Sequence, residues 1–334
     1  MTKLELIRPQ ESINISSGEV NYRLGYFHDM RNYEHRRLYT DHLIKGNVGA
    51  NESYGPFGFA IMISLNDEMK EKQRRVELIG EVKQGRDMRE KPPTIMVPRT
   101  AIDQIVDFQA MARWNDERAA RFQEGVTNFL VQTGTFSEVV LQPGFAKLLP
   151  IGKTIVIDGV AVNTAILACV DEQYPFLAEI VSNGWEHNCV MAISSANRSG
   201  EPTSTNPDDV WKIVKGMDHE VMILDNPQLR QEMGQLDKLN PCSYTILQAT
   251  TGWRESEGNI LFNIMRQGNV SPGRVYEGLK PGFKDVGLWI GRDSDLHASK
   301  ILAREPYCNL ARPFPPTKFC EALGIENRET DYGW

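Results

Sequence analysis

The chain has 334 residues, of which 41% are hydrophobic and 24% are charged. At roughly 150 residues per domain, this length gives about two domains, or one large domain with an appendage. The composition excludes a mainly disordered chain. The 37 Lys and Arg against 44 Asp and Glu give a net charge of −7, which excludes the overall basic field of a protein that lives on nucleic acid.

Neither membrane insertion nor metal binding is indicated. No stretch approaches the roughly 18 apolar residues of a membrane span, so we expect a cytoplasmic protein. The five cysteines form no CxxC pair and the six histidines form no HExxH motif, so we predict neither a disulfide framework nor a metal site. We expect the cysteines to be buried as small hydrophobic residues: Cys169, Cys189, Cys242, Cys308 and Cys320.

Hydrophobic periodicity predicts alternating strands and helices. Residues 1–45 read as an N-terminal extension, in which the charged segment 28–42 forms a surface helix. Asn66 is predicted to cap the first helix of the central region, and Thr100 with Asp103 resembles a capping box for another. Strands are predicted over residues 57–64, 94–98, 154–162, 164–170, 189–194, 220–225, 243–249 and 259–266. Helices are predicted over residues 68–83, 100–111, 117–132, 174–184 and 208–216, the last capped by Asn206.

These elements predict an α/β protein with a mixed sheet and helices on its faces. A segment rich in Gly and Pro follows Gly268 and marks a boundary. The predicted division is an N-terminal extension over 1–45, a nucleotide-binding domain over 46–272 and a C-terminal extension over 273–334. The IGKT sequence at 151–154 is not a P-loop, because its upstream glycine, Gly144, lies too far away.

The most informative segment directly follows the predicted strand 189–194. It reads Ser194, Ser195, Ala196, Asn197, Arg198, Ser199, Gly200, Glu201 and Pro202. Loops at the carboxyl ends of strands are where open α/β sheets bind ligands, and glycine lets backbone amides approach phosphate oxygens. Small hydroxyl and amide side chains would supply neutral donors. An ordinary turn held by its Asn and Ser side chains is the alternative.

This segment resembles the SAN-x-SG-x-P signature of the YrdC-like family. That family contains threonylcarbamoyl-AMP synthases and the related domain of hydrogenase-maturation carbamoyltransferases. The family's Lys-x-Arg basic loop is similar to Lys83 followed by either Arg86 or Arg89, with Lys91 beyond. Its Ser-Thr-Val-Val-Asp strand is similar to the segment containing Ser243 and Thr245, and its closing Ile-Leu-Arg-x-Gly to the segment containing Arg266. The resemblance covers about residues 55–270 and implies a YrdC-like twisted mixed sheet.

In this family, bicarbonate and the amine of threonine form a carbamate that attacks the α-phosphate of ATP. The resemblance therefore implies ATP and Mg²⁺ as cofactors and an indirect link to tRNA modification. It also implies roles for individual residues. Lys83, Arg86, Ser195 and Asn197 would be catalytic, while nucleotide contacts would come from Arg89, Lys91, Ser199, Gly200, Ser243, Thr245 and Arg266. Guanidinium and ammonium groups converging on phosphates suit this chemistry without a P-loop.

The sequence also departs from the family pattern. The family's Thr-Asp-Thr-x-Tyr-Gly loop, which helps form the amino-acid pocket, corresponds to residues 50–55, where Tyr-Gly is kept and both threonines are lost. Ser53 and Tyr54 are the substrate contacts that the resemblance implies. Glu52 would disfavour the carboxylate of a bound amino acid unless a cation compensates. The family's Arg-x-Pro and Pro-Gly-Pro elements are not found. Three functions stay open. The first is threonylcarbamoyl-AMP synthesis, and the second is carbamoyl transfer to another small-molecule acceptor, for example with carbamoyl phosphate as the donor. The third is non-catalytic binding of a nucleotide or RNA.

Overall fold

The computed structural model describes residues 27–53, 56–171, 174–198, 201, 203–204, 206–217, 220–226, 244–250, 255–256, 259–266, 270, 272–284 and 286–292. The strands are β1 Phe27–Asp29, β2 Gly49–Glu52, β3 Phe57–Ser64, β4 Thr94–Pro98, β5 Phe136–Val140, β6 Lys153–Ile157, β7 Val160–Val170, β8 Cys189–Ser195, β9 Met222–Asp225, β10 Ile246–Gln248, β11 Glu255–Ser256, β12 Asn259–Arg266 and β13 Gly287–Arg292. The α-helices are α2 Tyr33–Ile44, α3 Met69–Val82, α4 Ile102–Ile105, α5 Phe108–Met111, α6 Asp116–Thr133, α7 Pro143–Ala146, α8 Pro175–Glu186, α9 Pro207–Val214 and α11 Pro272–Leu279.

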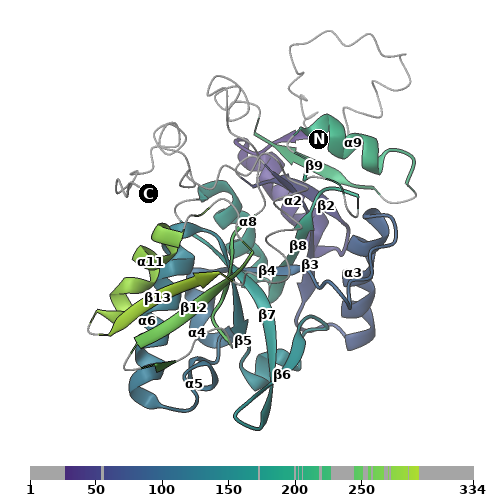
Figure 1. Cartoon of the computed structure of the whole chain (residues 1–334). Helices are drawn as coiled ribbons and strands as arrows, with labels where there is room; N and C mark the ends of the chain where they lie inside the picture. The colour runs from purple at the N-terminus through teal and green to yellow at the C-terminus, as the bar shows by residue number, and fades with distance from the viewer. Residues whose placement is uncertain are drawn as a thin grey trace.

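Within these residues, all thirteen strands belong to one mixed sheet, which confirms the predicted fold class (Figure 1). The strand order is β1-β9-β2-β3-β8-β4-β7-β5-β10-β12-β11, with β13 beside β12 and β6 beside β7. Both predicted extensions contribute to this sheet, because β1 pairs with β9 and β13 pairs with β12. The division into domains stays a prediction. No strand was predicted at β1, β2, β5, β11 or β13, and β1 overlaps the helix predicted over 28–42.

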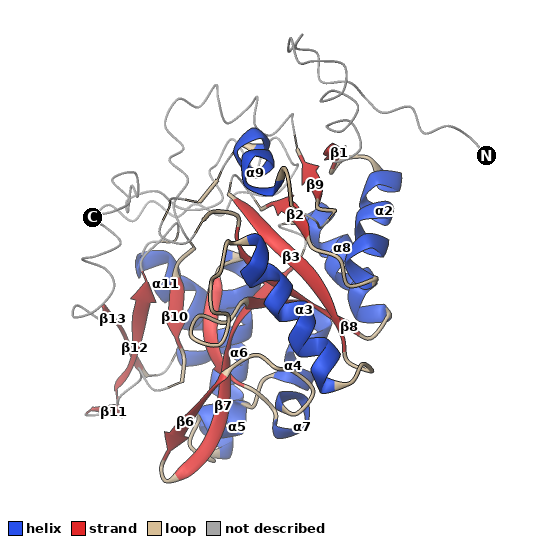
Figure 2. Cartoon of the chain, turned by 90° about the vertical axis from the view of Figure 1, so that its right-hand side faces the viewer, coloured by secondary structure: helices blue, strands red, loops and turns tan. Residues whose placement is uncertain are grey.

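Helices cover the two faces of the sheet with different partners. One core cluster joins α3 and α6 to the strands through residues such as Ile79, Phe122 and Phe129. The other joins α2 and α8 to the opposite face through Tyr39, Leu43 and Ile180. Figure 2 shows α3 lying across the strands on its face of the sheet. Alternating side chains on β3, β8 and β4 contribute to both cores, as expected for strands buried on both faces.

Several predicted elements match the structure, and others need correction. The strands β3, β4 and β12 have the predicted bounds, and Asn206 caps α9 by accepting from the Asp208 amide at 2.9 Å. Asn66 does not cap α3, because the helix begins at Met69 and its N-cap residue is Glu68. The helix predicted over 100–111 is broken at Val106, whose extended backbone forms a bridge with Leu141.

The predicted boundary between the strands 154–162 and 164–170 was also wrong. The chain turns at Asp158 and Gly159, whose φ values of 47° and 85° place both residues in the left-handed region. This Asp-Gly pair closes the β6–β7 hairpin, so β7 runs unbroken from Val160 to Val170. Helix α8 does not end at Gly184 but continues to Glu186. Gly184 is needed for packing, since a Cβ there would lie 2.5 Å from Cε of Met62.

Candidate functional site

Lys83 lies at the point where α3 meets the end of β8. The apolar face of α3 packs against the sheet through Val76, Ile79 and Val82, which brings the next residue to the end of the strand. The Lys83 side chain is only 1% exposed. Its Nζ donates to the Asn197 carbonyl at 3.0 Å and to Asn197 Oδ1 at 2.8 Å, and it also contacts the carbonyl and Oγ of Ser195. One buried ammonium therefore binds two residues of the SAN segment.

The SAN segment itself is held by hydrogen bonds on both sides. Ser195 Oγ donates to Asn197 Oδ1 at 2.6 Å, and Asn197 Nδ2 donates to the Glu201 carbonyl. The Ala196 amide donates to the Phe57 carbonyl at 2.7 Å, which ties the segment to the first residue of β3. The loop is thus positioned by the sheet before any ligand binds. Ser199 and Gly200 lie outside the described residues.

Arg86 reaches the same strand end from a tight turn after α3. Gln84 and Gly85 have positive φ values of 61° and 89°, and the Gly85 and Arg86 amides both donate to the Gly80 carbonyl. A Cβ at Gly80 would lie 2.5 Å from the Arg86 carbonyl oxygen, so glycine lets the turn pack against the helix. Arg86 Nη1 donates to Ser194 Oγ at 3.2 Å and Nη2 to the Lys91 carbonyl at 3.2 Å.

Two cations therefore meet at this strand end without a counter-charge. Burial, together with a smaller effect of the neighbouring Arg86 guanidinium, lowers the pKa of Lys83 to about 7. Burial also lowers the pKa of Arg86, whose Nε is buried without a hydrogen-bond partner in the described part of the chain. No described carboxylate pairs with either side chain. An anion bound to both groups would supply the opposite charge that the described residues lack.

The structure separates the other predicted basic residues from this pair. The Arg89 side chain is 77% exposed, and its Nη2 lies 3.4 Å from Oε1 of Glu77. Lys91 is exposed, and its contact with the pair is the backbone carbonyl that accepts from Arg86. Of the two arginines that the basic loop offers, Arg86 is the one beside Lys83. The signal that distinguishes them is the glycine pair at positions 80 and 85, which the sequence analysis did not use.

The remaining predicted residues gather around Tyr244, at the amino end of β10. Ser53 is buried, and its carbonyl accepts from the Tyr244 hydroxyl. Arg266 Nε donates to the Tyr244 carbonyl at 2.9 Å. Thr245 Oγ1 donates to the Val270 carbonyl at 2.9 Å and accepts from its amide at 3.0 Å, so this hydroxyl ties two segments together. Tyr54 and Ser243 lie outside the described residues.

Glu52 has an internal role at the end of β2. Its side chain is 2% exposed, and Oε2 accepts from the Asn226 amide at 2.9 Å. The hydrogen bond joins the ends of β2 and β9, which are parallel neighbours. This position, where the resemblance implies a neutral hydroxyl, thus carries a buried carboxylate that the fold itself uses.

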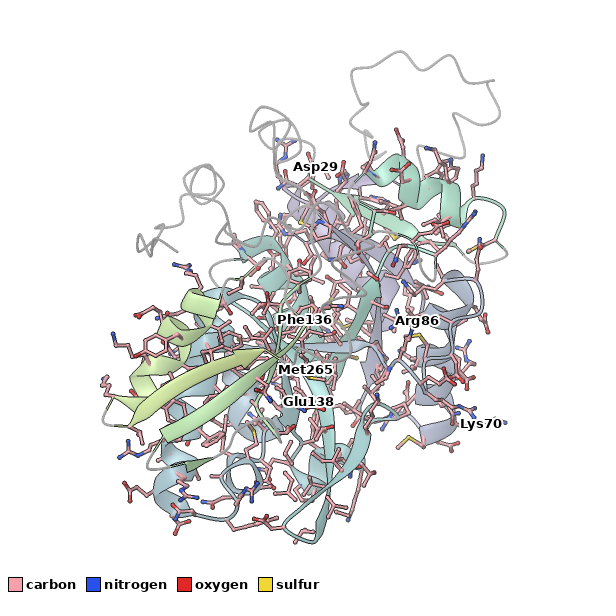
Figure 3. All side chains as sticks on the ribbon, in the orientation of Figure 1. Asp29, Lys70, Arg86, Phe136, Glu138 and Met265 are labelled. Atoms are coloured by element: carbon pink, nitrogen blue, oxygen red, sulfur yellow. The ribbon has the colours of Figure 1, made fainter. Side chains whose placement is uncertain are left out.

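A polar row that the sequence analysis missed crosses three other strands. Glu138 on β5 pairs in register with Gln248 on β10, which pairs with Asn263 on β12. Their side chains share the sheet face of Phe136 and Met265, because Val139 and Leu247 belong to the opposite core. Figure 3 shows Phe136, Met265 and Glu138 close together near the middle of the sheet, with Arg86 to their right. The sequence signal was a single acid within the apolar run at 136–141.

The described residues also bear on the predictions for cysteines, metals and membranes. Cys169 and Cys189 are free and buried, and Cys242, Cys308 and Cys320 fall outside the described residues. No group of three or more His, Cys, Asp or Glu side chains able to hold a metal ion occurs in the described part of the chain. Among the described helices, none combines the length and the apolar composition that crossing a membrane requires.

Comparisons with known proteins show the fold. No protein-family profile and no curated protein matches the sequence. A double-substituted variant of P. abyssi Sua5 has a TM-score of 0.50 and 14% identity, over 75% of this chain and 59% of that chain. P. abyssi Sua5 complexed with L-threonine has a TM-score of 0.49 and 14% identity, over 77% of this chain and 59% of that chain. Full-length HypF in its phosphate- and nucleotide-bound form has a TM-score of 0.44 and 14% identity, over 70% of this chain and 29% of that chain.

The chain therefore spans about three-fifths of the length of the Sua5 chains it matches. The likeness to the first of them is a shared fold, which agrees with the YrdC-like resemblance of the SAN segment at the level of architecture. Activity does not follow from a fold. The functional argument rests on the residues at the end of β8.

Proposed function

We propose that the protein is an ATP-dependent enzyme that forms a carbamoyl-adenylate-type intermediate. In the family that the chain resembles, the usual product is threonylcarbamoyl-AMP, which is made from threonine, bicarbonate and ATP for tRNA modification, and we take it as the first candidate product. The observation that carries this proposal is the pair of cations beside the SAN segment, buried Lys83 and half-buried Arg86, with no described counter-charge. Such a pair supports the binding of phosphates.

The proposed chemistry needs no covalent enzyme intermediate. An amine and bicarbonate form a carbamate and water. A carbamate oxygen then attacks the α-phosphorus of ATP, its P–O bond forms, and the bond to the departing pyrophosphate breaks. Lys83 and Arg86 would neutralise phosphate charge, while Ser195 and Asn197 would orient the adenylate phosphate. Mg²⁺ would arrive with the triphosphate, since the described side chains form no metal-ligand cluster of their own.

One observation favours a second acceptor over threonine. Glu52 stands where the resemblance implies a neutral hydroxyl in the amino-acid pocket, and its carboxylate is buried against the Asn226 amide. The family's way of holding threonine is therefore altered at this position. Carbamoyl transfer to a different small-molecule acceptor is the second candidate, and it would use the same cation pair.

Pyrophosphate release tests these candidates. The protein is incubated with ATP, Mg²⁺ and bicarbonate, with a panel of amino acids and other amines, and separately with carbamoyl phosphate. Threonine-dependent release supports the default product, and release with another amine or with carbamoyl phosphate supports the second candidate. No release with any donor, together with binding of ATP or RNA, would contradict both and favour a non-catalytic module.

The variant Lys83→Met tests the site itself. It should abolish release and weaken ATP binding at least tenfold, because it removes one of two phosphate-binding charges. The matched control is Lys70→Met, which makes the same change on an exposed residue at the other end of α3 (Figure 3). Equal ATP affinity in both variants would show that Lys83 is not part of the nucleotide site.

A further inference from the structure

Glu138 is a half-buried carboxylate without a described cationic partner. Its Oε2 accepts from Thr250 Oγ1 at 2.8 Å and its Oε1 from Thr164 Oγ1 at 3.4 Å. Hydroxyl donors satisfy hydrogen-bond capacity but do not neutralise the charge, and a charge removed from water is costly until an opposite charge approaches. No ion pair links Glu138 to any Lys, Arg or His that the structure describes. A cationic ligand would supply the opposite charge.

The surroundings of Glu138 suit a small organic cation. Its row neighbours Gln248 and Asn263 carry amides that both donate and accept. On the same face, Phe136 and Tyr244 stack with their ring centroids 4.5 Å apart, beside Met265. Aromatic and thioether surfaces accommodate an aliphatic stem, and aromatic faces also attract cations.

This face of the sheet is not packed by the described helices that border it. Helix α5 contacts β5 and α6 contacts β7. Residues of α6 and α11 belong to the core cluster that contains Val139 and Leu247, which is the opposite face. The described helices α2 and α8 pack mainly farther along the sheet, against β3, β4, β8 and β9, although α8 also contacts β7, the neighbour of β5. Glu138 therefore faces away from the helical layer behind it.

The same face continues to the SAN segment, at a distance that fixes what Glu138 can bind. Ser195 follows Ile193 by two residues on β8, so both point to the face that carries Phe136. Helix α3 packs on the other face, and Lys83 after it reaches Ser195 and Asn197 at the strand end. Strands β4 and β7 lie between β8 and β5. Three strand spacings make about 14 Å, which is too far for one group to contact both sites. A ligand that reaches both must be extended, with a reacting group near Lys83 and a cationic group near Glu138.

Resting on the proposed function, we propose that Glu138 binds the far, positively charged end of the acceptor. The acceptor class is a basic amino acid or a diamine, with one amine that becomes the carbamate and a second ammonium or guanidinium group that pairs with Glu138. A divalent metal fits less well, since Glu138 is a single carboxylate about 14 Å from the phosphate site and the described residues form no cluster around it.

Calorimetry with matched ligand pairs tests this binding. Lysine is compared with norleucine, which keeps the four-carbon side chain but lacks the terminal ammonium, and arginine with citrulline, which has the same length but no side-chain charge. The wild-type protein should bind the cationic member roughly tenfold more tightly. Glu138→Gln should reduce that ratio to about one, whereas the matched control Glu186→Gln, an exposed residue at the end of α8, should keep it. Equal affinities in the wild type, or a preference that survives in Glu138→Gln, would overturn the proposal.

Two further measurements keep the test decisive. Raising NaCl from 0.05 to 0.5 M on the wild type should weaken lysine but not norleucine, which does not depend on a variant that folds. Titration with Mg²⁺ alone identifies the competing cation, and tight Mg²⁺ binding that Glu138→Gln abolishes, without a lysine preference, would replace the proposal.

The same amines in the pyrophosphate assay separate this inference from the proposed function. Release with lysine that Glu138→Gln lowers about tenfold in kcat/KM supports both. Equal release with lysine and norleucine would leave the proposed function standing and overturn the inference. Lysine binding that depends on Glu138, without pyrophosphate release from any amine, would contradict the proposed function while the Glu138 site stands.

Discussion

The low pKa of Lys83 predicts that anion binding takes up a proton. With a pKa of about 7, about 10% of Lys83 is charged at pH 8 and about 90% at pH 6. A bound phosphate favours the charged form and raises this pKa, so about 0.9 proton should be taken up per ligand at pH 8 and about 0.1 at pH 6. The apparent affinity should fall roughly 30-fold from pH 6 to pH 8.5, or about 2 kcal/mol, as free Lys83 loses its charge.

Calorimetry of pyrophosphate or ATP in two buffers of different ionisation enthalpy measures that proton directly. The control is Lys83→Arg, whose guanidinium stays charged across this range, so subtracting its curve removes the ligand's own titration. The predicted result is a difference of about 0.9 proton at pH 8 that vanishes near pH 6. Identical proton uptake by the wild type and Lys83→Arg at pH 8 would refute the assignment of Lys83 to the anion site.

Three further outcomes follow from the same contacts. Arg86→Gln should weaken pyrophosphate binding at least tenfold in the same calorimetry. It should also move the pH midpoint of proton uptake by Lys83 upward, because the Arg86 charge lowers the pKa of Lys83. An unchanged midpoint would exclude that coupling. Gly80→Ala should cost about 1–3 kcal/mol in urea unfolding, since its Cβ would lie 2.5 Å from the Arg86 carbonyl oxygen, whereas Gly144→Ala, where the site is open, should cost almost nothing. The pKa of Lys83 is lower in the folded than in the unfolded chain, so the unfolded chain holds more protons. The free energy of unfolding should therefore rise by up to about 1.4 kcal/mol per pH unit between about pH 7 and pH 10. Lys83→Met should lack this rise, and equal slopes in the wild type and the variant would count against the buried charge.

Sequence patterns predicted the centre of the fold because buried strands leave unambiguous apolar runs. The runs at β3, β4 and β12 have no helical alternative of that length, so their bounds agree with the structure. The helix predicted over 100–111 failed because Val106 pairs with Leu141, a contact from another part of the chain. The hairpin turn at Asp158 and Gly159 was visible as a dipeptide but lay inside a run of strand-forming residues.

Only the part of the candidate site that depends on local sequence was predictable. The SAN segment and Lys83 were singled out by position and residue type, and the structure brings them together at the end of β8. Burial separates Arg86 from Arg89, and burial depends on the turn at Gln84 and Gly85 rather than on charge. Glu138 escaped notice because its row partners come from strands that lie more than 100 residues away in the sequence.

A crystal structure with bound ATP or pyrophosphate is the most direct test of the cation pair. The account predicts phosphate oxygens within about 3.2 Å of Lys83 Nζ and of the Arg86 guanidinium, with Asn197 released from Lys83 to face the ligand. Phosphates bound elsewhere on the protein, with Lys83 still holding Ser195 and Asn197, would contradict it.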